Sequence, residues 1–137
     1  MPTDEEHNMN ENGQLIARLY GAFESSDLDT IRESLDEDVI LHQAGRGPLS
    51  GVHEGRDEVL GVLGSLIALS EGTFHSKVHD ILANDEHVVV LSENTASARG
   101  KTLQERGVEI FHVTDGKVTE AFFTAFDLYE MDEFFTA

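Results

Sequence analysis

The sequence contains no cysteine, which excludes disulfide bonds and thiol nucleophiles. It also has no apolar run of about 18 residues, the length that a membrane-spanning helix needs. The first residues, MPTDEEHNMNENG, are acidic and polar, unlike a signal peptide. We therefore expect a cytoplasmic protein in which residues 1–10 form a frayed acidic tail and residues 11–137 form a single domain.

Basic residues are scarce: 9 Lys and Arg stand against 27 Asp and Glu, for a formal net charge of −18. Such a surface repels nucleic acids and anionic lipids, so neither is expected as a partner. The excess of acidic residues fits a halophilic protein whose charges need concentrated salt for screening. An ordinary acidic protein is the alternative.

Several common catalytic motifs are missing. The glycine-rich stretch at 44–55 has no Gly-Lys-Ser/Thr after it and no lysine, so it is not a phosphate-binding loop. No Gly-x-Ser-x-Gly elbow is present, which argues against a serine hydrolase. His75 and His79 are four residues apart on an expected strand, about 13 Å, too far to bind one metal ion. We expect no metal and no other cofactor.

Hydrophobic periodicity predicts both helices and strands. Helices are expected at about 10–25, at 56–70 and at 127–135. A further short helix is expected to begin after Ser26, which would cap it. Strands are expected at about 38–43, 73–83, 87–99, 102–114 and 117–126. Between the last two strands, Asp115 and Gly116 form the strongest short hairpin signal in the chain.

This order predicts an α+β fold: a strongly bent antiparallel sheet with three helices on its concave side and a cone-shaped cavity between them. In the strand at 102–114, Glu109 shares one face with Phe111, while Ile110 and His112 lie on the other. Because both faces carry apolar groups, we expect one to meet the helices and the other to meet a second copy in a homodimer.

Four segments carry a family resemblance: LYGAFESSDLDTIRESLDEDVILH, GPLSGVHEGRDEVL, FHVTDGKVTEAF and DLYEMDEFF. Their order and spacing resemble the nuclear transport factor 2-like superfamily, in particular its SnoaL-like and ketosteroid-isomerase-like members. The resemblance implies a cone-shaped, cystatin-like α+β barrel. It implies no single activity, because this fold hosts isomerases, cyclases, epoxide hydrolases, dehydratases and non-catalytic binding proteins.

The isomerase comparison can be made residue by residue. His42 stands where the isomerase has its general base, and Glu109 stands where it has a protonated oxyanion-hole acid. Its oxyanion-hole tyrosine aligns with Leu19, which implies that this donor is missing. Tyr20 is one residue along, about 100° round the helix, and is not assumed to replace it.

Two functions are consistent with these residues. The first is an isomerase- or cyclase-type enzyme acting on an apolar carbonyl compound, with His42 as base and Glu109 as acid or oxyanion donor. The second is a non-catalytic domain for small-molecule binding or dimeric interaction. His42 and Glu109 would then anchor a ligand as a charged pair. Alternatively, His42 would form a hydrogen bond to loop backbone, and Glu109 would face solvent or a dimer interface. The residues expected to line the ligand site are Leu19, Phe23, His53, Leu66, Phe74, Phe111, Phe122 and Thr124.

Overall fold

The computed structural model describes residues 10–136, so the tail expected at 1–10 lies outside the described residues except for Asn10. The helices are α2 (Glu11–Glu24), α3 (Leu28–Ser34), α4 (Arg56–Leu69) and α5 (Leu128–Phe135). The strands are β1 (Leu35–Gln43), β2 (Gly51–Glu54), β3 (His75–Ala83), β4 (His87–Ala98), β5 (Lys101–Thr114) and β6 (Lys117–Ala125). Within this part of the chain, no helix is both long and apolar enough to cross a membrane.

The strands form one mixed sheet in the order β2-β1-β6-β5-β4-β3. The α+β class is confirmed, but the expectation of a wholly antiparallel sheet is wrong, because β1 runs parallel to β6. A hairpin turn fixes the relative direction of consecutive strands, whereas β1 and β6 are far apart in the chain and no local signal sets their direction. Helix α5 corresponds to the last helix expected, at 127–135, whereas the short strand β2 lies inside the stretch expected to be a loop.

Local turn signals account for most element boundaries. Asp115 and Gly116 have φ angles of 51° and 75°, as the predicted hairpin turn requires. The predicted cap of the second helix is wrong by one residue: Asp27, not Ser26, accepts a hydrogen bond from the backbone N–H of Thr30. Ser26 instead adopts a left-handed backbone with φ 58°, which turns the chain out of α2.

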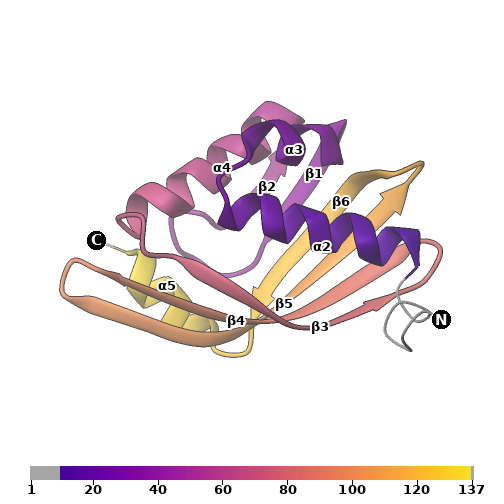
Figure 1. Ribbon diagram of the computed structural model, residues 1–137. Helices are drawn as coiled ribbons and strands as arrows, with labels where there is room; N and C mark the ends of the chain where they lie inside the picture. Colours follow the sequence, from indigo (N-terminus) through magenta and orange to yellow (C-terminus); the bar gives the residue numbers. More distant parts are fainter. Residues whose placement is uncertain (1–9, 137) are drawn as a thin grey trace.

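The helices and the sheet enclose the core. Figure 1 shows α2, α3 and α4 on one side of the bent sheet, with α5 near the end of the β4–β5 hairpin. The buried core joins α2 and α4 to the central strands through side chains such as Ile16, Val59 and Phe111. A second cluster forms around Phe134 and Phe135 of α5, which are both buried, as expected for residues that fix this helix to the body.

The alternation of β5 sets the inside of the fold. Its buried residues are Leu103, Glu105, Gly107, Glu109, Phe111 and Val113. The intervening side chains lie on the opposite face of the sheet, so the predicted division of this strand is confirmed. Two acidic side chains therefore point towards the interior of a protein that carries most of its charge outside.

Candidate functional site

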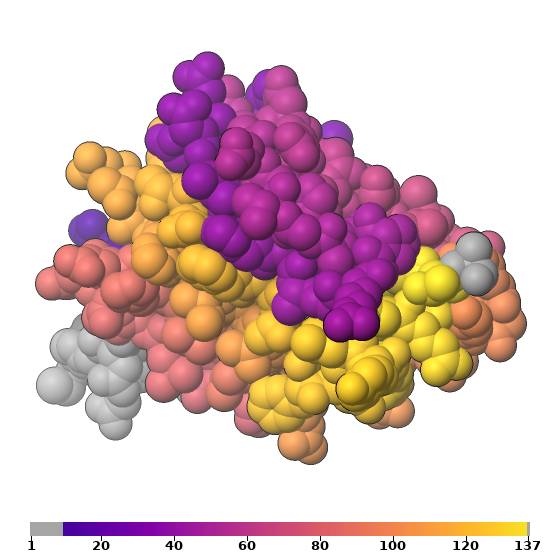
Figure 2. All heavy atoms as spheres, turned by 180° about the vertical axis from the view of Figure 1, so that it is seen from behind, coloured from indigo at the N-terminus to yellow at the C-terminus, as the bar shows by residue number. Residues whose placement is uncertain are grey.

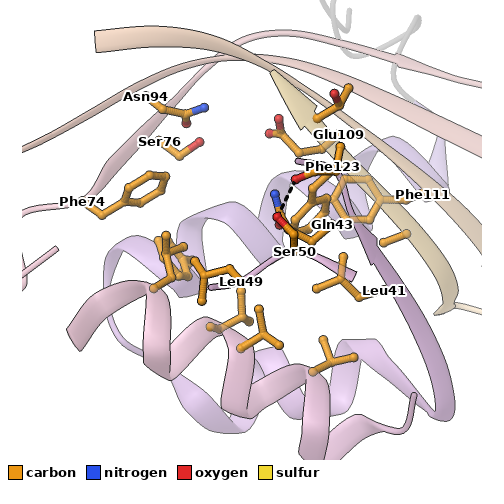
Figure 3. A pocket seen from close by; sticks show the side chains of 18 of the residues that line it. Leu41, Gln43, Leu49, Ser50, Phe74, Ser76, Asn94, Glu109, Phe111 and Phe123 are labelled. Carbon is orange, nitrogen blue, oxygen red and sulfur yellow. Dashed lines mark hydrogen bonds between the residues drawn. The ribbon is translucent and has the colours of Figure 1, made fainter. Parts of the chain in front are cut away.

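A cavity of about 140 Å³ lies between the helices and the inner face of the sheet. Figure 3 shows part of its lining, with Phe74 at one end, Phe111 and Phe123 at the other, and Glu109 and Asn94 along the sheet. The lining is mainly aliphatic and aromatic, and none of the lining residues is Lys, Arg or His. Its polar side chains are those of Tyr20, Gln43, Ser50, Ser76, Asn94, Glu109, Thr124 and Asp132.

Helix α5 and the loop at 44–50 close the cavity on one side. Asp132 of α5 accepts hydrogen bonds from the backbone N–H groups of Arg46, at 2.9 Å, and Gly47, at 3.1 Å. Gly45 has a φ of 104°, and a Cβ there would lie 2.4 Å from Asp132 Oδ1, so only glycine fits. Figure 2 shows α5, in yellow, directly beside the purple and magenta part of the chain that contains this loop.

Glu109 is the main ionisable group in the cavity. It lies in the middle of β5 and only 8% of its surface is exposed. The Tyr20 hydroxyl donates to Glu109 Oε1 at 2.6 Å, and Ser92 Oγ donates to Oε2 at 3.0 Å. Burial raises the pKa of Glu109 to about 7, the two hydrogen bonds oppose the rise, and the charge of Glu105 adds to it. Both protonation states are therefore populated near neutral pH.

Tyr20 comes from α2 and packs edge-on against Phe111, with ring centroids 6.1 Å apart. Burial, and then the charge of Glu109, raises the pKa of Tyr20 well above its usual value, so its hydroxyl stays protonated. The prediction that a tyrosine donor is missing is therefore wrong. Leu19 and Tyr20 both line the cavity, because the helix passes alongside it and two side chains about 100° apart both reach it.

A row of hydrogen-bonded side chains continues from Glu109 along the sheet. Asn94 Nδ2 donates to Ser92 Oγ at 3.3 Å and to Glu105 Oε1 at 2.7 Å. We call Tyr20, Glu109, Ser92, Asn94 and Glu105 the polar row. Burial raises the pKa of Glu105, while the hydrogen bond from Asn94 lowers it. Two buried acids are thus joined through one amide and one hydroxyl.

Gly107 makes room for the polar row. It lies opposite Ser92 in the β4–β5 register, between Glu105 and Glu109 on the same face. A Cβ at this position would lie 2.6 Å from both Asn94 Nδ2 and Glu109 Oε2, and 2.7 Å from Ser92 Oγ. Any side chain larger than hydrogen would therefore displace the polar groups from one another.

His42 does not share the cavity with Glu109, so the predicted pair is wrong. Its neighbours Leu41 and Gln43 line the cavity, and strand alternation places His42 on the other face of the sheet. There its Nε2 lies 2.7 Å from Glu120 Oε2, and its ring stacks on Phe122 at 4.3 Å. The sequence shows a histidine near the end of the strand, but a shift of one residue decides which face of the sheet it occupies.

Of the eight residues expected to line the ligand site, six line this cavity: Leu19, Phe23, Leu66, Phe74, Phe111 and Thr124. Phe122 does not, because it lies on the outer face with His42, and its neighbour Phe123 points inward instead. His53 does not either: its Nε2 lies 2.9 Å from the backbone oxygen of Leu49, which holds the ring against the loop.

Sequence reasoning missed Tyr20, Ser92, Asn94 and Glu105. A signal existed, since Ser92 and Asn94 are two residues apart, as are Glu105, Gly107 and Glu109, and strand alternation places each set on one face. Nothing local showed that this face is the inner one, however, because polar residues on a strand usually face water. Among residues 10–136, no three His, Asp or Glu side chains come together in a way that could hold a metal ion.

Comparison with known proteins identifies the family. The model of the SnoaL-like domain matches residues 16–121, and the chain belongs to this family. It is 32% identical over 106 residues to the uncharacterized protein Rv0034 of Mycobacterium tuberculosis, covering 77% of this chain and 81% of that protein.

The chain is also similar to several solved structures. Bal32a, from a soil-derived mobile gene cassette, is 31% identical with a TM-score of 0.89, over 93% of this chain and 98% of that one. A protein of unknown function with a cystatin-like fold from Xanthomonas campestris is 31% identical with a TM-score of 0.87, over 94% of this chain and 100% of that one. IdmH of Streptomyces antibioticus, a candidate polyketide cyclase, is 21% identical with a TM-score of 0.73, over 89% of this chain and 96% of that one. At this identity, the last comparison shows the fold alone.

Proposed function

We propose that this protein is an enzyme that moves a proton at a carbon next to a carbonyl group in a neutral, mostly apolar compound. The observation that carries the proposal is Glu109, a buried carboxyl in an apolar cavity with a pKa of about 7. A general base works best when its pKa lies near the working pH, because it is then ionised in part and still basic enough to accept a proton. Glu109 takes the role first assigned to His42.

The step begins with ionised Glu109. One of its oxygens accepts the proton from the carbon, the C–H electron pair moves into the bond to the carbonyl carbon, and the carbonyl oxygen becomes an enolate. Glu109 then returns the proton to the same carbon or to another carbon of the conjugated system. The apolar lining keeps solvent from protonating the enolate directly. The proton held on the carboxyl oxygen of Glu109 exchanges with solvent in some turnovers, so in D₂O the carbon gains deuterium.

Tyr20 supports this step as a hydrogen-bond donor. Its hydroxyl stays protonated and already points at Glu109 Oε1. A carbonyl oxygen that displaces this contact would accept the same hydrogen bond, which strengthens as negative charge develops on the oxygen. Ser92 continues to hold the other carboxyl oxygen of Glu109 in place.

The charge of the lining favours a neutral ligand. The lining residues include two acids, Glu109 and Asp132, and no basic side chain. A carboxylate or phosphate in the cavity would have no cation to pair with, and burying it would cost several kcal/mol. A volume of about 140 Å³ is enough for a compact ring compound. Among proteins of this fold, candidate polyketide cyclases give precedent for carbonyl substrates, at the level of fold only.

Hydrogen exchange of a neutral ketone tests the proposal. The protein is incubated with 1-tetralone in D₂O at pH 7.5, and deuterium uptake at the carbon next to the carbonyl is followed by NMR. We expect catalysed uptake that falls at least about 100-fold in Glu109→Gln. The matched control is Glu120→Gln, the same change on the outer face, which should keep the wild-type rate. Equal rates in wild type and Glu109→Gln would overturn the proposed role.

A non-catalytic ligand-binding domain is the second candidate. It is favoured by the two hydrogen bonds that already engage both oxygens of Glu109, since such contacts also occur in purely structural carboxyls. This alternative predicts that 1-tetralone binds but gains no deuterium above the rate in buffer.

The expected homodimer stays a prediction. The outer face of the sheet carries a row of rings in which Phe122 stacks on His42, 4.3 Å away, and tilts against His112, 5.8 Å away. Light scattering in high salt, which screens the repulsion between two chains of charge −18, should give twice the mass of one chain. The mass of a monomer would contradict the prediction.

A further inference from the structure

The cavity contains a second polar side chain, Asn94, that the proposed proton transfer does not use. The side chain of Asn94 lines the cavity and the residue is only 4% exposed, yet its Oδ1 atom has no hydrogen-bond partner. An unpaired buried carbonyl oxygen costs about 1–3 kcal/mol, so proteins rarely keep one without a reason. In Figure 3, Asn94 and Ser76 lie next to each other on the sheet side of the cavity.

The neighbours of Asn94 fix the orientation of its amide. Its Nδ2 atom has two protons and two acceptors within reach, Glu105 Oε1 at 2.7 Å and Ser92 Oγ at 3.3 Å. Turning the amide round would bring its oxygen against Glu105 and lose both of these bonds. The amide oxygen of Asn94 is therefore the atom without a hydrogen-bond partner, and it can only accept a hydrogen bond.

Ser76 adds a hydroxyl beside this oxygen. It pairs directly with Asn94 in the β3–β4 register, so the two side chains lie on the same face of the sheet. Both residues line the cavity. Together they form a small polar patch, which we call the amide patch, in a lining that is otherwise mainly apolar.

The geometry points to a binding subsite at the amide patch for a hydroxyl group of the ligand, which donates its hydrogen to Asn94 Oδ1. The inference rests on the proposed function, because it specifies the substrate class of the same cavity: a neutral carbonyl compound with a hydroxyl group away from the carbonyl. The carbonyl end lies at Tyr20 and Glu109, and the hydroxyl end lies at Asn94 and Ser76. A ligand without the hydroxyl leaves the amide oxygen unpaired and is selected against.

Paired ketones test the subsite by binding alone. Dissociation constants are measured by NMR titration for 1-tetralone and for its 5-, 6- and 7-hydroxy derivatives, with wild type and two variants. In wild type, at least one hydroxy isomer should bind about 5- to 10-fold more tightly than 1-tetralone, the usual effect of one neutral hydrogen bond. In Asn94→Leu, which keeps the approximate shape but removes the amide, this preference should fall below about 2-fold. Thr124→Val, which removes a polar group of the cavity lining outside the amide patch, should retain it.

A second readout needs no variant, so it holds even if Asn94→Leu fails to fold. The side-chain amide resonance of Asn94 should shift with the preferred hydroxy isomer and not with 1-tetralone. Equal affinities for all four ketones, an unmoved amide resonance, or a preference that survives in Asn94→Leu would each overturn the subsite.

These results separate the subsite from the catalytic proposal. A hydroxyl preference with no deuterium exchange would support the subsite and reject the catalysis. Deuterium exchange that depends on Glu109, with no preference for a hydroxy ketone, would support the catalysis and reject the subsite. If none of the four ketones binds, the ligand class is wrong and the subsite inference falls with it.

Discussion

Replacing Glu109 with glutamine should remove a pH dependence of stability that this one side chain creates. The pKa of Glu109 is raised from 4.5 to about 7 in the folded protein, chiefly by burial. Between these values the folded protein holds a proton that the unfolded chain has released, so stability falls as the pH rises through this window and levels off above the folded pKa. At about 1.4 kcal/mol for each pKa unit, the total cost of the buried charge is about 3 kcal/mol.

Urea unfolding at constant ionic strength measures this effect. Between pH 5.5 and pH 8, the free energy of unfolding of the wild type should drop by about 2 kcal/mol through Glu109, because about 1.5 units of the window lie above pH 5.5. In Glu109→Gln most of this drop should disappear, since glutamine does not titrate and can still accept from Tyr20.

The control is Glu93→Gln, which removes an exposed carboxyl on the outer face of β4 and should keep the wild-type slope. It also accounts for the loss of one negative charge from a strongly acidic protein. Equal slopes in wild type and Glu109→Gln would refute the reasoning, because they would show that Glu109 ionises alike in the folded and unfolded chains.

Three further predictions follow from the same structure. In Tyr20→Phe, Glu109 loses a hydrogen bond that lowers its pKa, so the midpoint of the pH–rate profile for deuterium exchange should move above 7; a midpoint that stays in place would count against the contact. In Gly107→Ala, the new Cβ meets three polar atoms at 2.6–2.7 Å, and urea unfolding should show a loss of about 1–3 kcal/mol, whereas Gly64→Ala, whose Cβ meets nothing within 4 Å, should not lose stability. Moving the protein from molar to millimolar salt should lower its melting temperature, because a net charge of −18 is then poorly screened; an unchanged value would argue against a halophilic protein.

The sequence predicted the fold well wherever signals are local. Asp115 and Gly116 correctly predicted the last hairpin, and alternation in β5 correctly placed Glu109 and Phe111 on the same face of the sheet. The parallel pairing of β1 with β6 could not be predicted in the same way, because it joins residues about 80 positions apart. No single tight turn connects these two strands, so no local signal sets their direction.

The site was predicted only in part. Glu109 and most of the apolar lining were found, but His42 was placed on the wrong face and Tyr20 was set aside. Both errors depend on one residue of register: a strand reverses its faces at each residue, and a helix turns by about 100°. The hydrogen bonds of Asn94 were out of reach for another reason, since they depend on two strands and on a glycine opposite Ser92.

The most direct test of the central claim is the titration of the Glu109 side chain itself. Carboxyl ¹³C NMR of the labelled protein, with Glu109→Gln to assign the resonance, would follow its ionisation from pH 4 to pH 9. The structure predicts a midpoint near 7, set by burial in an apolar cavity. A midpoint near 4.5, the ordinary value for a glutamate, would contradict it.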